Sequence, residues 1–308
     1  MNTTDLRFAS NKVCDIERLF HKELDDIYGK GETKMMVRML WEAWMGWSHT
    51  EQLLRRGETI NQSELLRMHW ALEDLKRGRP IQYIIGWTEF CGCHIGVDET
   101  TLIPRPETEE IVEKTIMMYG EQEQKDGKKM APKRVLDLCT GSGCIAIALA
   151  KAWPTTYIIG VDISTGALKK ARENAEKNEV RVEYMEGNIL NDEFCEKLQK
   201  QASPYPFDII ISNPPYICKK ERIEMRKNVL DYEPATALFV DDNNALCFYQ
   251  KIAKIGEKTL DESGVIVVEI NEHLGNETMR VFENSGFEGK LEKDFLNKNR
   301  MIIVKKKQ

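Results

Sequence analysis

VLDLCTGSGC, residues 135–144, is followed by an apolar stretch at residues 145–150. This pattern is typical of a buried strand, a turn with two glycines and a helix. Glycine tolerates positive φ and lets the backbone approach a ligand closely. The start of a helix supplies free N–H groups and the positive end of a dipole. The stretch therefore predicts an α/β fold with a ligand site where this strand ends.

The next apolar strand, residues 157–161, leads to Asp162 about 20 residues after the glycines, a spacing typical of a carboxylate that binds ribose hydroxyls. The glycines form Gly141-x-Gly143 rather than G-x-G-x-x-G, and the strand before them carries the acidic Asp137. A pyrophosphate ligand is therefore disfavoured and a cationic nucleoside is favoured. Asp137 is suited to pair with the ammonium or sulfonium end of S-adenosylmethionine.

A stiff elbow, Asn213-Pro214-Pro215-Tyr216, follows a third apolar run at residues 207–212. The prolines remove two N–H donors and fix two φ angles, and a residue before proline is pushed toward an extended conformation. The elbow is therefore rich in hydrogen-bond acceptors, among them the Asn213 side chain, and Tyr216 adds a flat face. Such a segment can hold a planar –NH2 group by both hydrogens, although an ordinary strand-to-loop turn has the same composition.

Strand and helix patterns alternate from residue 134 onward, which predicts a parallel, doubly wound sheet with ligands at the C-terminal ends of its strands. Strands are expected at 134–138, 157–161, 181–185, 207–212, 264–270 and 301–305, with another near 287–291. Helices are expected from Glu107 to about residue 118 and near 143–152, 165–178, 244–261 and 274–285. The polar residues 119–133 are expected to form a surface loop.

The residues before this region divide into two parts. Apolar residues recur at helical spacing through residues 1–77, which predicts a helical domain in which Trp41, Trp44 and Trp47 are core residues. Residues 78–104 mix β-branched, aromatic and glycine residues, which predicts a β-hairpin linker. The larger α/β domain is expected to span residues 105–308.

Three further motifs link the chain to a known family. They are GRPIQYIIG at residues 78–86, EFCG at 89–92 and LIPRPETE at 102–109, and Tyr232-Glu233-Pro234 follows the elbow. With the glycine turn and the elbow, they make the chain resemble the HemK-type protein-(glutamine-N5) methyltransferases over nearly its whole length. The elbow is shared with nucleic-acid amino-methyltransferases, whereas the segment at 103–108 is not.

The resemblance implies a seven-stranded Rossmann-like methyltransferase sheet with a reversed last hairpin. It also implies methyl transfer from S-adenosylmethionine to the glutamine of the Gly-Gly-Gln motif in peptide chain release factors, which would dock on the helical domain. In this family pattern the Asn213 side chain and the Pro214 carbonyl accept the two amide hydrogens of the substrate. The implied substrate-binding residues are Arg105, Glu107, Asn213, Pro214, Pro215, Tyr216 and Glu233; Arg105 and Glu107 would close the site, and Glu233 would hold the substrate loop.

The implied cofactor contacts are Asp137, Cys139, Thr140, Gly141, Ser142, Gly143, Asp162, Asn188, Ile189 and Asn213. Three of these positions depart from the common family pattern. Cys139 stands where glycine is usual and is therefore expected to avoid positive φ. Asn188 replaces an aspartate, and Ile189 stands where some members carry an aromatic residue, so the adenine contacts are expected to differ.

Composition agrees with an enzyme of the cytoplasm. The 308 residues carry a net charge of −6, which disfavours direct nucleic-acid binding. Eight scattered cysteines indicate reduced thiols, and five isolated histidines predict no metal site. No secretory signal or membrane span is expected. The open alternatives are a ribosomal-protein glutamine methyltransferase, a DNA or RNA amino-methyltransferase, a nicotinamide-dependent oxidoreductase and a binding module without catalytic activity.

Overall fold

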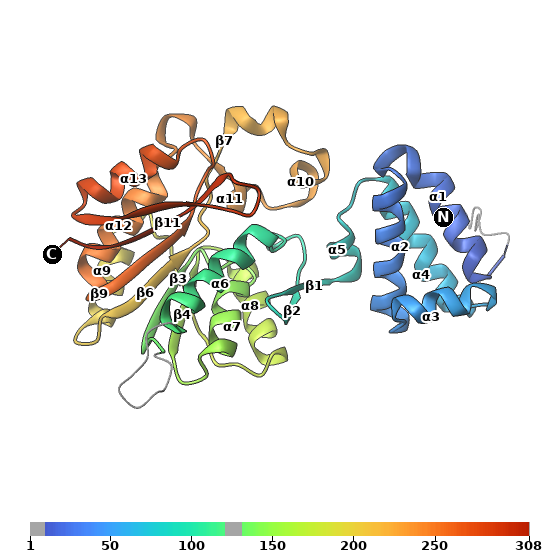
Figure 1. The fold of residues 1–308 in the computed structure, drawn as a ribbon, viewed down its shortest axis with the longest axis horizontal. Coiled ribbons are helices and arrows are strands. Elements are labelled where there is room, and N and C mark those ends of the chain that lie inside the picture. Colours follow the sequence, from blue (N-terminus) through green and yellow to red (C-terminus); the bar gives the residue numbers. More distant parts are fainter. Residues whose placement is uncertain (1–9, 121–130, 308) are drawn as a thin grey trace. The chain divides into compact units, whose positions relative to one another are not determined.

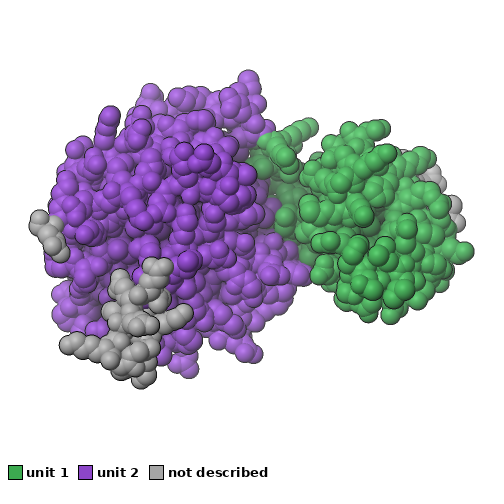
Figure 2. Space-filling view, in the orientation of Figure 1, with its two compact units in different colours: residues 1–86, 226–232 green, residues 87–225, 233–308 purple. Residues whose placement is uncertain are grey.

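The computed structural model describes residues 10–120 and 131–307. Most of the predicted surface loop at 119–133 lies outside the described residues. The chain forms two compact units (Figure 2). Unit 1 is Met1–Gly86 with Arg226–Tyr232, and unit 2 is Trp87–Met225 with Glu233–Gln308.

These limits differ from the predicted boundaries at residues 77 and 104. Residues 78–86 belong to unit 1 because Ile81–Ile85 form a short helix whose Ile81 joins the helical core. The hairpin is correspondingly shorter than the predicted linker: Trp87–Phe90 pairs with Cys93–Gly96. The return of residues 226–232 to unit 1 carries no signal in the local sequence pattern, because it depends on contacts far apart in the chain.

Unit 1 is helical. Its helices are α1 (Val13–Tyr28), α2 (Lys30–Met45), α3 (His49–Leu54), the 3-10 turn η1 (Arg55–Gly57), α4 (Gln62–Lys76), α5 (Ile81–Ile85) and α10 (Lys227–Tyr232). Capping boxes at Ser48 and Asn61 start α3 and α4. Trp41 is fully buried, and Trp47 stacks on it with ring centroids 5.3 Å apart. Trp44 also packs against this core, so the prediction that the tryptophans serve packing is confirmed.

Unit 2 contains the predicted seven-stranded sheet (Figure 1). Its order is β10-β11-β9-β6-β3-β4-β5, and β11 runs antiparallel to both neighbours while β9, β6, β3, β4 and β5 are parallel. The strands are β3 (Arg134–Leu138), β4 (Tyr157–Asp162), β5 (Glu183–Glu186), β6 (Phe207–Ser212), β9 (Leu260–Glu269), β10 (Phe287–Lys293) and β11 (Asn299–Lys306). The fold class and the reversed last hairpin are confirmed.

Helices cover both faces of the sheet, which explains why its central strands are apolar on both sides. One face carries α6 (Pro106–Gly120), α7 (Cys144–Ala152) and α8 (Thr165–Lys177), and the other carries α9 (Asp192–Ala202), α12 (Cys247–Thr259) and α13 (Gly275–Asn284) (Figure 1). Helix α9 was not expected from the sequence. The connections hold β1 (Trp87–Phe90), β2 (Cys93–Gly96), β7 (Ile217–Cys218), β8 (Phe239–Val240), α11 (Ala235–Leu238) and the 3-10 turns η2 (Lys219–Glu224) and η3 (Asp242–Asn244).

Helix α8 joins the β1–β2 hairpin to the glycine turn through one buried amide. The Asn174 Oδ1 accepts the backbone N–H of Gly96 at 2.8 Å, and its Nδ2 donates to the Gly96 and Ser142 carbonyls, each at 2.9 Å. One turn later, Asn178 makes the same exchange with the backbone of His94. These side chains act like a neighbouring strand for the hairpin edge, and Asn174 also fixes the turn after β3.

We expect Asn174→Ala to lower the free energy of unfolding by about 2–3 kcal/mol, because buried backbone groups lose their partners. Denaturant titration would measure the loss. Glu176→Ala, at an exposed position of the same helix, is the control and should change stability by less than about 0.5 kcal/mol. Equal stability of the two variants would contradict this account of Asn174.

Candidate active site

A cavity of about 480 Å³ lies where four parallel strands end. Its walls come from the segments after β3, β4, β5 and β6, with contributions from residues 100–108 and 234–248. The predicted site residues that line it are Arg105, Cys139, Thr140, Gly141, Ser142, Asp162, Asn188, Ile189, Asn213 and Pro215. Six predicted residues lie behind or beside this lining: Glu107, Asp137, Gly143, Pro214, Tyr216 and Glu233.

The glycine turn corrects one expectation. Cys139 has φ +62°, so it adopts the positive φ that a side chain at this position was expected to avoid. The turn needs a left-handed residue directly after β3, and cysteine takes that conformation at a steric cost on the order of 1 kcal/mol. Gly141 has φ +55° and donates its N–H to Asp162 Oδ2 at 2.8 Å. A Cβ on Gly143 would lie 2.6 Å from the Tyr184 hydroxyl, so Gly143 serves packing rather than the cavity surface.

Asp137 is fully buried beneath this turn. Its Oδ2 accepts the Thr140 hydroxyl at 2.5 Å, and Thr140, not Asp137, faces the cavity. Burial raises the pKa of Asp137 to about 7, although the Thr140 hydroxyl and the Ala146 N–H lower it. Asp137 lies behind Thr140 and does not line the cavity itself. Its direct pairing with a cationic ligand stays a prediction.

Asp162 occupies the position expected of a diol-binding carboxylate. Its Oδ2 accepts the Gly141 N–H, and its Oδ1 accepts the Ser164 N–H at 2.9 Å. Burial raises its pKa, whereas these backbone donors lower it. Each oxygen keeps a further lone pair, and the residue lines the cavity. Asp162 is thus held in place with capacity to accept two hydroxyl hydrogens.

The predicted adenine residues lie together after β5. Asn188 is exposed, and its Oδ1 accepts the Leu190 N–H at 2.9 Å. This hydrogen bond uses the oxygen of the side-chain amide and not its Nδ2. Ile189 is buried and supplies apolar surface. At this position Asn188 can donate a hydrogen bond, which an aspartate could not do. The expected difference in adenine contacts stays a prediction.

The elbow alternates between the cavity and the interior. Asn213 and Pro215 line the cavity, whereas Pro214 and Tyr216 do not, as expected of an extended segment. Asn213 Nδ2 donates to the Thr108 hydroxyl at 3.1 Å. Among the described residues, no donor contacts Asn213 Oδ1. The elbow thus presents a free carboxamide oxygen beside the glycine turn.

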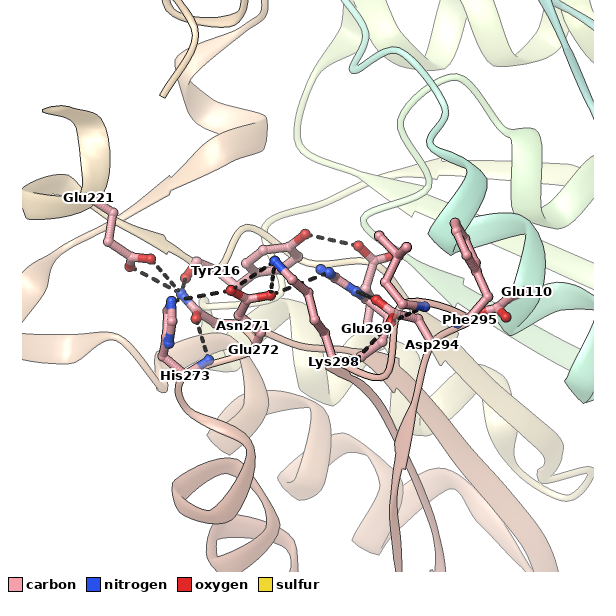
Figure 3. Close-up of polar contacts among 12 residues, drawn as sticks. Glu110, Tyr216, Glu221, Glu269, Asn271, Glu272, His273, Asp294, Phe295 and Lys298 are labelled. Atoms are coloured by element: carbon pink, nitrogen blue, oxygen red, sulfur yellow. Dashed lines mark hydrogen bonds and ion pairs between the residues drawn. The ribbon is translucent and has the colours of Figure 1, made fainter. Parts of the chain in front are cut away.

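Two residues that the sequence interpretation missed lie beneath the elbow. Glu269, at the end of β9, is 1% exposed and accepts the Tyr216 hydroxyl at 2.9 Å and the Thr108 hydroxyl at 2.6 Å. Asn271, two residues later, donates to the Tyr216 carbonyl at 3.2 Å (Figure 3). A signal for Glu269 exists in the sequence: it is the single acid at the end of the apolar run GVIVVEI.

The segment before α6 is closed by an ion pair. Arg105 Nη2 lies 2.5 Å from Glu233 Oε1, and the Ile103 N–H donates to Glu233 Oε2 at 3.2 Å. The Glu233 side chain is 1% exposed. Two residues predicted independently are therefore partners, while the predicted roles of Arg105 in closing the site and of Glu233 in holding the substrate loop stay predictions. Glu107 makes no hydrogen bond or ion pair with another described residue, and its charge raises the pKa of Glu269.

Over residues 10–120 and 131–307, no three histidine, cysteine, aspartate or glutamate residues are grouped to hold a metal ion. No helix in this part of the chain combines the length and apolar character that crossing a bilayer requires.

The buried Asp137 predicts a pH dependence of stability. Its folded pKa of about 7 exceeds its ordinary 3.8, so the folded state holds a proton that the unfolded state lacks between these values. Stability therefore falls as pH rises from about 4 to 7, and the full loss is present above 7. In thermal unfolding without ligand, Asp137→Asn should be more stable than the parent at pH 8, on the order of 2–4 kcal/mol, and similar to it at pH 4.

Asp26→Asn, at an exposed position, is the matched control and should follow the parent at every pH. If the stability of the parent and of Asp137→Asn changed in parallel from pH 4 to 8, the Asp137 carboxylate would not be the source of the pH dependence of stability.

Comparison with known proteins identifies the family. The model for the PrmC N-terminal domain matches residues 21–86, and that for the methyltransferase small domain matches residues 124–232. The release factor glutamine methyltransferase of Flavobacterium psychrophilum is 40% identical over 286 residues, 92% of this chain and 96% of the relative. That of Bacteroides thetaiotaomicron is 33% identical over 94% of this chain and 98% of its own. The release factor glutamine methyltransferase of Lactococcus lactis is 41% identical over 80% of this chain and 85% of its own length. The chain belongs to the release factor glutamine methyltransferase family.

Proposed function

We propose that this protein transfers a methyl group from S-adenosylmethionine to the side-chain amide nitrogen (N5) of the glutamine in the Gly-Gly-Gln motif of peptide chain release factors. The observation that carries the proposal is that Asn213, whose carboxamide oxygen is free, lines the same cavity as the glycine turn and Asp162. A methyl donor and an amide acceptor can therefore meet in one place. The relatives' names supply the substrate class.

The polar and apolar groups of the cavity match those of the cofactor. Asp162 has two free lone pairs for a ribose diol, and Ile189 offers apolar surface for adenine, with the Asn188 amide beside it. At the N-terminus of α7 the Ala146 N–H is used by Asp137, whereas Cys144 and Ile145 line the cavity and no side chain caps the helix. The N–H groups of these two residues would therefore face a ligand carboxylate. S-adenosylmethionine would supply an electrophilic sulfonium methyl.

The chemistry asks the protein chiefly for alignment. A carboxamide nitrogen is a poor nucleophile because its lone pair is delocalised. Acceptors at Asn213 Oδ1 and the Pro214 carbonyl would hold its two hydrogens, orient the lone pair and favour the positive charge that develops on nitrogen. The substrate nitrogen would gain the methyl group as the methyl carbon separates from sulfur, and one amide proton would then leave to solvent. No histidine base is needed.

The remaining surfaces are assigned in the same way. We assign the helices within residues 1–77 to release-factor docking and residues 105–308 to catalysis, and within the predicted linker at 78–104 we assign the connection to the β1–β2 hairpin. The exposed Trp70 and Leu66 on α4 support the docking role, because such apolar side chains mark protein contacts. The Arg105–Glu233 pair would order the wall near the substrate glutamine. Eight free cysteines support action in the cytoplasm, and the net charge of −6 supports a protein rather than a nucleic-acid substrate.

Asn213→Ala tests the proposal. It removes one of two acceptors, so methyl transfer should fall about 100-fold or more. Adenosylmethionine affinity should fall far less, because Asp162 and the glycine turn still line the cavity. Mass spectrometry of a purified release factor would locate the methyl group on one glutamine, and calorimetry would measure cofactor binding. Asn284→Ala, an exposed asparagine on α13, is the matched control.

Full activity of Asn213→Ala would remove the elbow from the mechanism. A methyl group on a ribosomal-protein glutamine, with none on the release factor, would replace the proposed substrate while keeping the chemistry. Incorporation into DNA or RNA, with binding that weakens steeply with salt, would instead identify a nucleic-acid enzyme.

A further inference from the structure

We propose that Glu269, acting through Thr108, fixes the orientation of the Asn213 carboxamide so that Asn213 offers the substrate its oxygen and never its NH2 group. This inference rests on the proposed function, since it concerns how the elbow grips an amide. Glu269 and Thr108 would be positioning residues, because each acts through Asn213: Glu269 binds the Thr108 hydroxyl, and that hydroxyl binds the Asn213 amide.

The Glu269 carboxylate accepts hydrogen bonds from two hydroxyl groups. Each oxygen of Glu269 faces one hydroxyl: Oε2 faces Thr108 at 2.6 Å and Oε1 faces Tyr216 at 2.9 Å. An ionised carboxylate has only acceptors, so both hydroxyl hydrogens must point toward it. Burial raises the pKa of Glu269 above its ordinary value, and the charge of Glu107 adds to the rise; the two hydroxyls and the charge of Arg300 oppose it by stabilising the ionised form.

The direction of the Thr108 hydroxyl hydrogen in turn determines the orientation of the Asn213 side chain. Thr108 has a single hydroxyl hydrogen, which is committed to Glu269, so its oxygen can only accept. Its remaining neighbour is the Asn213 side chain, 3.1 Å away. Asn213 must therefore turn its NH2 group toward Thr108, which leaves Oδ1 on the other branch of the carboxamide. Oxygen and nitrogen of an amide side chain are hard to tell apart from shape alone, and this chain of donors decides between them.

If the Asn213 carboxamide were rotated by 180°, it would make two unfavourable contacts. Its oxygen would oppose the lone pairs of Thr108, and its NH2 group would oppose the N–H groups of the substrate amide. The same carboxylate holds the Tyr216 hydroxyl, and Asn271 holds the Tyr216 carbonyl (Figure 3). The end of β9 thus controls both ends of the elbow, one through an amide orientation and one through a ring position.

We call the chain of hydrogen bonds from Glu269 through Thr108 to Asn213 the relay. A double-mutant cycle between residues 108 and 213 tests it. Thr108→Val keeps the side-chain shape without the hydroxyl, and kcat should fall about 10- to 100-fold, with release-factor KM and adenosylmethionine affinity changed by less than about threefold. Thr108→Ser restores the hydroxyl and should recover most of the rate. In the Asn213→Ala background, Thr108→Val should cause no further loss. Glu269→Gln, which can donate as well as accept, should lower kcat in the same way.

Three results would overturn the relay: full activity of Thr108→Val, equal losses for Thr108→Val and Thr108→Ser, or an undiminished loss from Thr108→Val in the Asn213→Ala background. Thermal unfolding of each variant verifies that it is folded.

A second measurement does not depend on turnover. With asparagine-selective ¹⁵N labelling, the Asn213 side-chain NH2 signals are assigned by their absence in Asn213→Ala. We expect one hydrogen to exchange slowly with water in the parent and in Thr108→Ser, and quickly in Thr108→Val. Equal exchange in all three proteins refutes the relay. If the parent methylates no release factor but this pattern is found, the proposed function fails and the orientation of Asn213 stands.

Discussion

The parallel register of β3 and β6 is the constraint on which the site depends. Leu138 pairs with Ser212, so both strands end at the same level, and the residues that follow them emerge side by side. The buried Ser212 hydroxyl donates to the Leu138 carbonyl at 2.6 Å and ties these ends together. The glycine turn and the proline elbow, about 70 residues apart, thereby form adjoining walls of one cavity, as is usual at the C-terminal edge of such sheets. A shift of one residue in this pairing would turn the strands' side chains to the opposite faces and separate the two motifs.

Buried carboxylates organise the loops around this edge. Asp137 holds Thr140, Glu233 holds Arg105 and the Ile103 N–H, and Glu269 holds Thr108. Each acid lies beneath or beside the cavity and directs a residue that lines it. Removing a carboxylate from water costs free energy, and hydroxyl, N–H and guanidinium donors offset that cost. The cavity wall is therefore ordered from behind by carboxyl groups that do not line the cavity themselves.

Local patterns predicted the strands, the glycine turn, the elbow and the carboxylate at Asp162, because these depend on periodicity and on glycine and proline geometry. The positive φ of Cys139 was mispredicted, because the turn after β3 imposes it regardless of the side chain. The roles of Thr108 and Glu269 were missed for a different reason. Thr108 lies 105 residues from Asn213 and 161 from Glu269, so only the folded sheet brings them together. The same holds for helix α10, which belongs to the unit formed by the N-terminal helices.

The charge at Glu269 has a structural consequence that a neutral group of the same shape would not have. A glutamine or a hydroxyl group at the end of β9 could donate as well as accept a hydrogen bond. The Thr108 hydroxyl could then point either way, and both orientations of the Asn213 amide would find a partner. A carboxylate removes one of these arrangements because it accepts only. Buried ionic groups often contribute little to stability after desolvation, and their retention can reflect specificity instead. Here the specificity concerns a single torsion: the 180° turn of the Asn213 carboxamide that decides whether the elbow offers an acceptor or a donor.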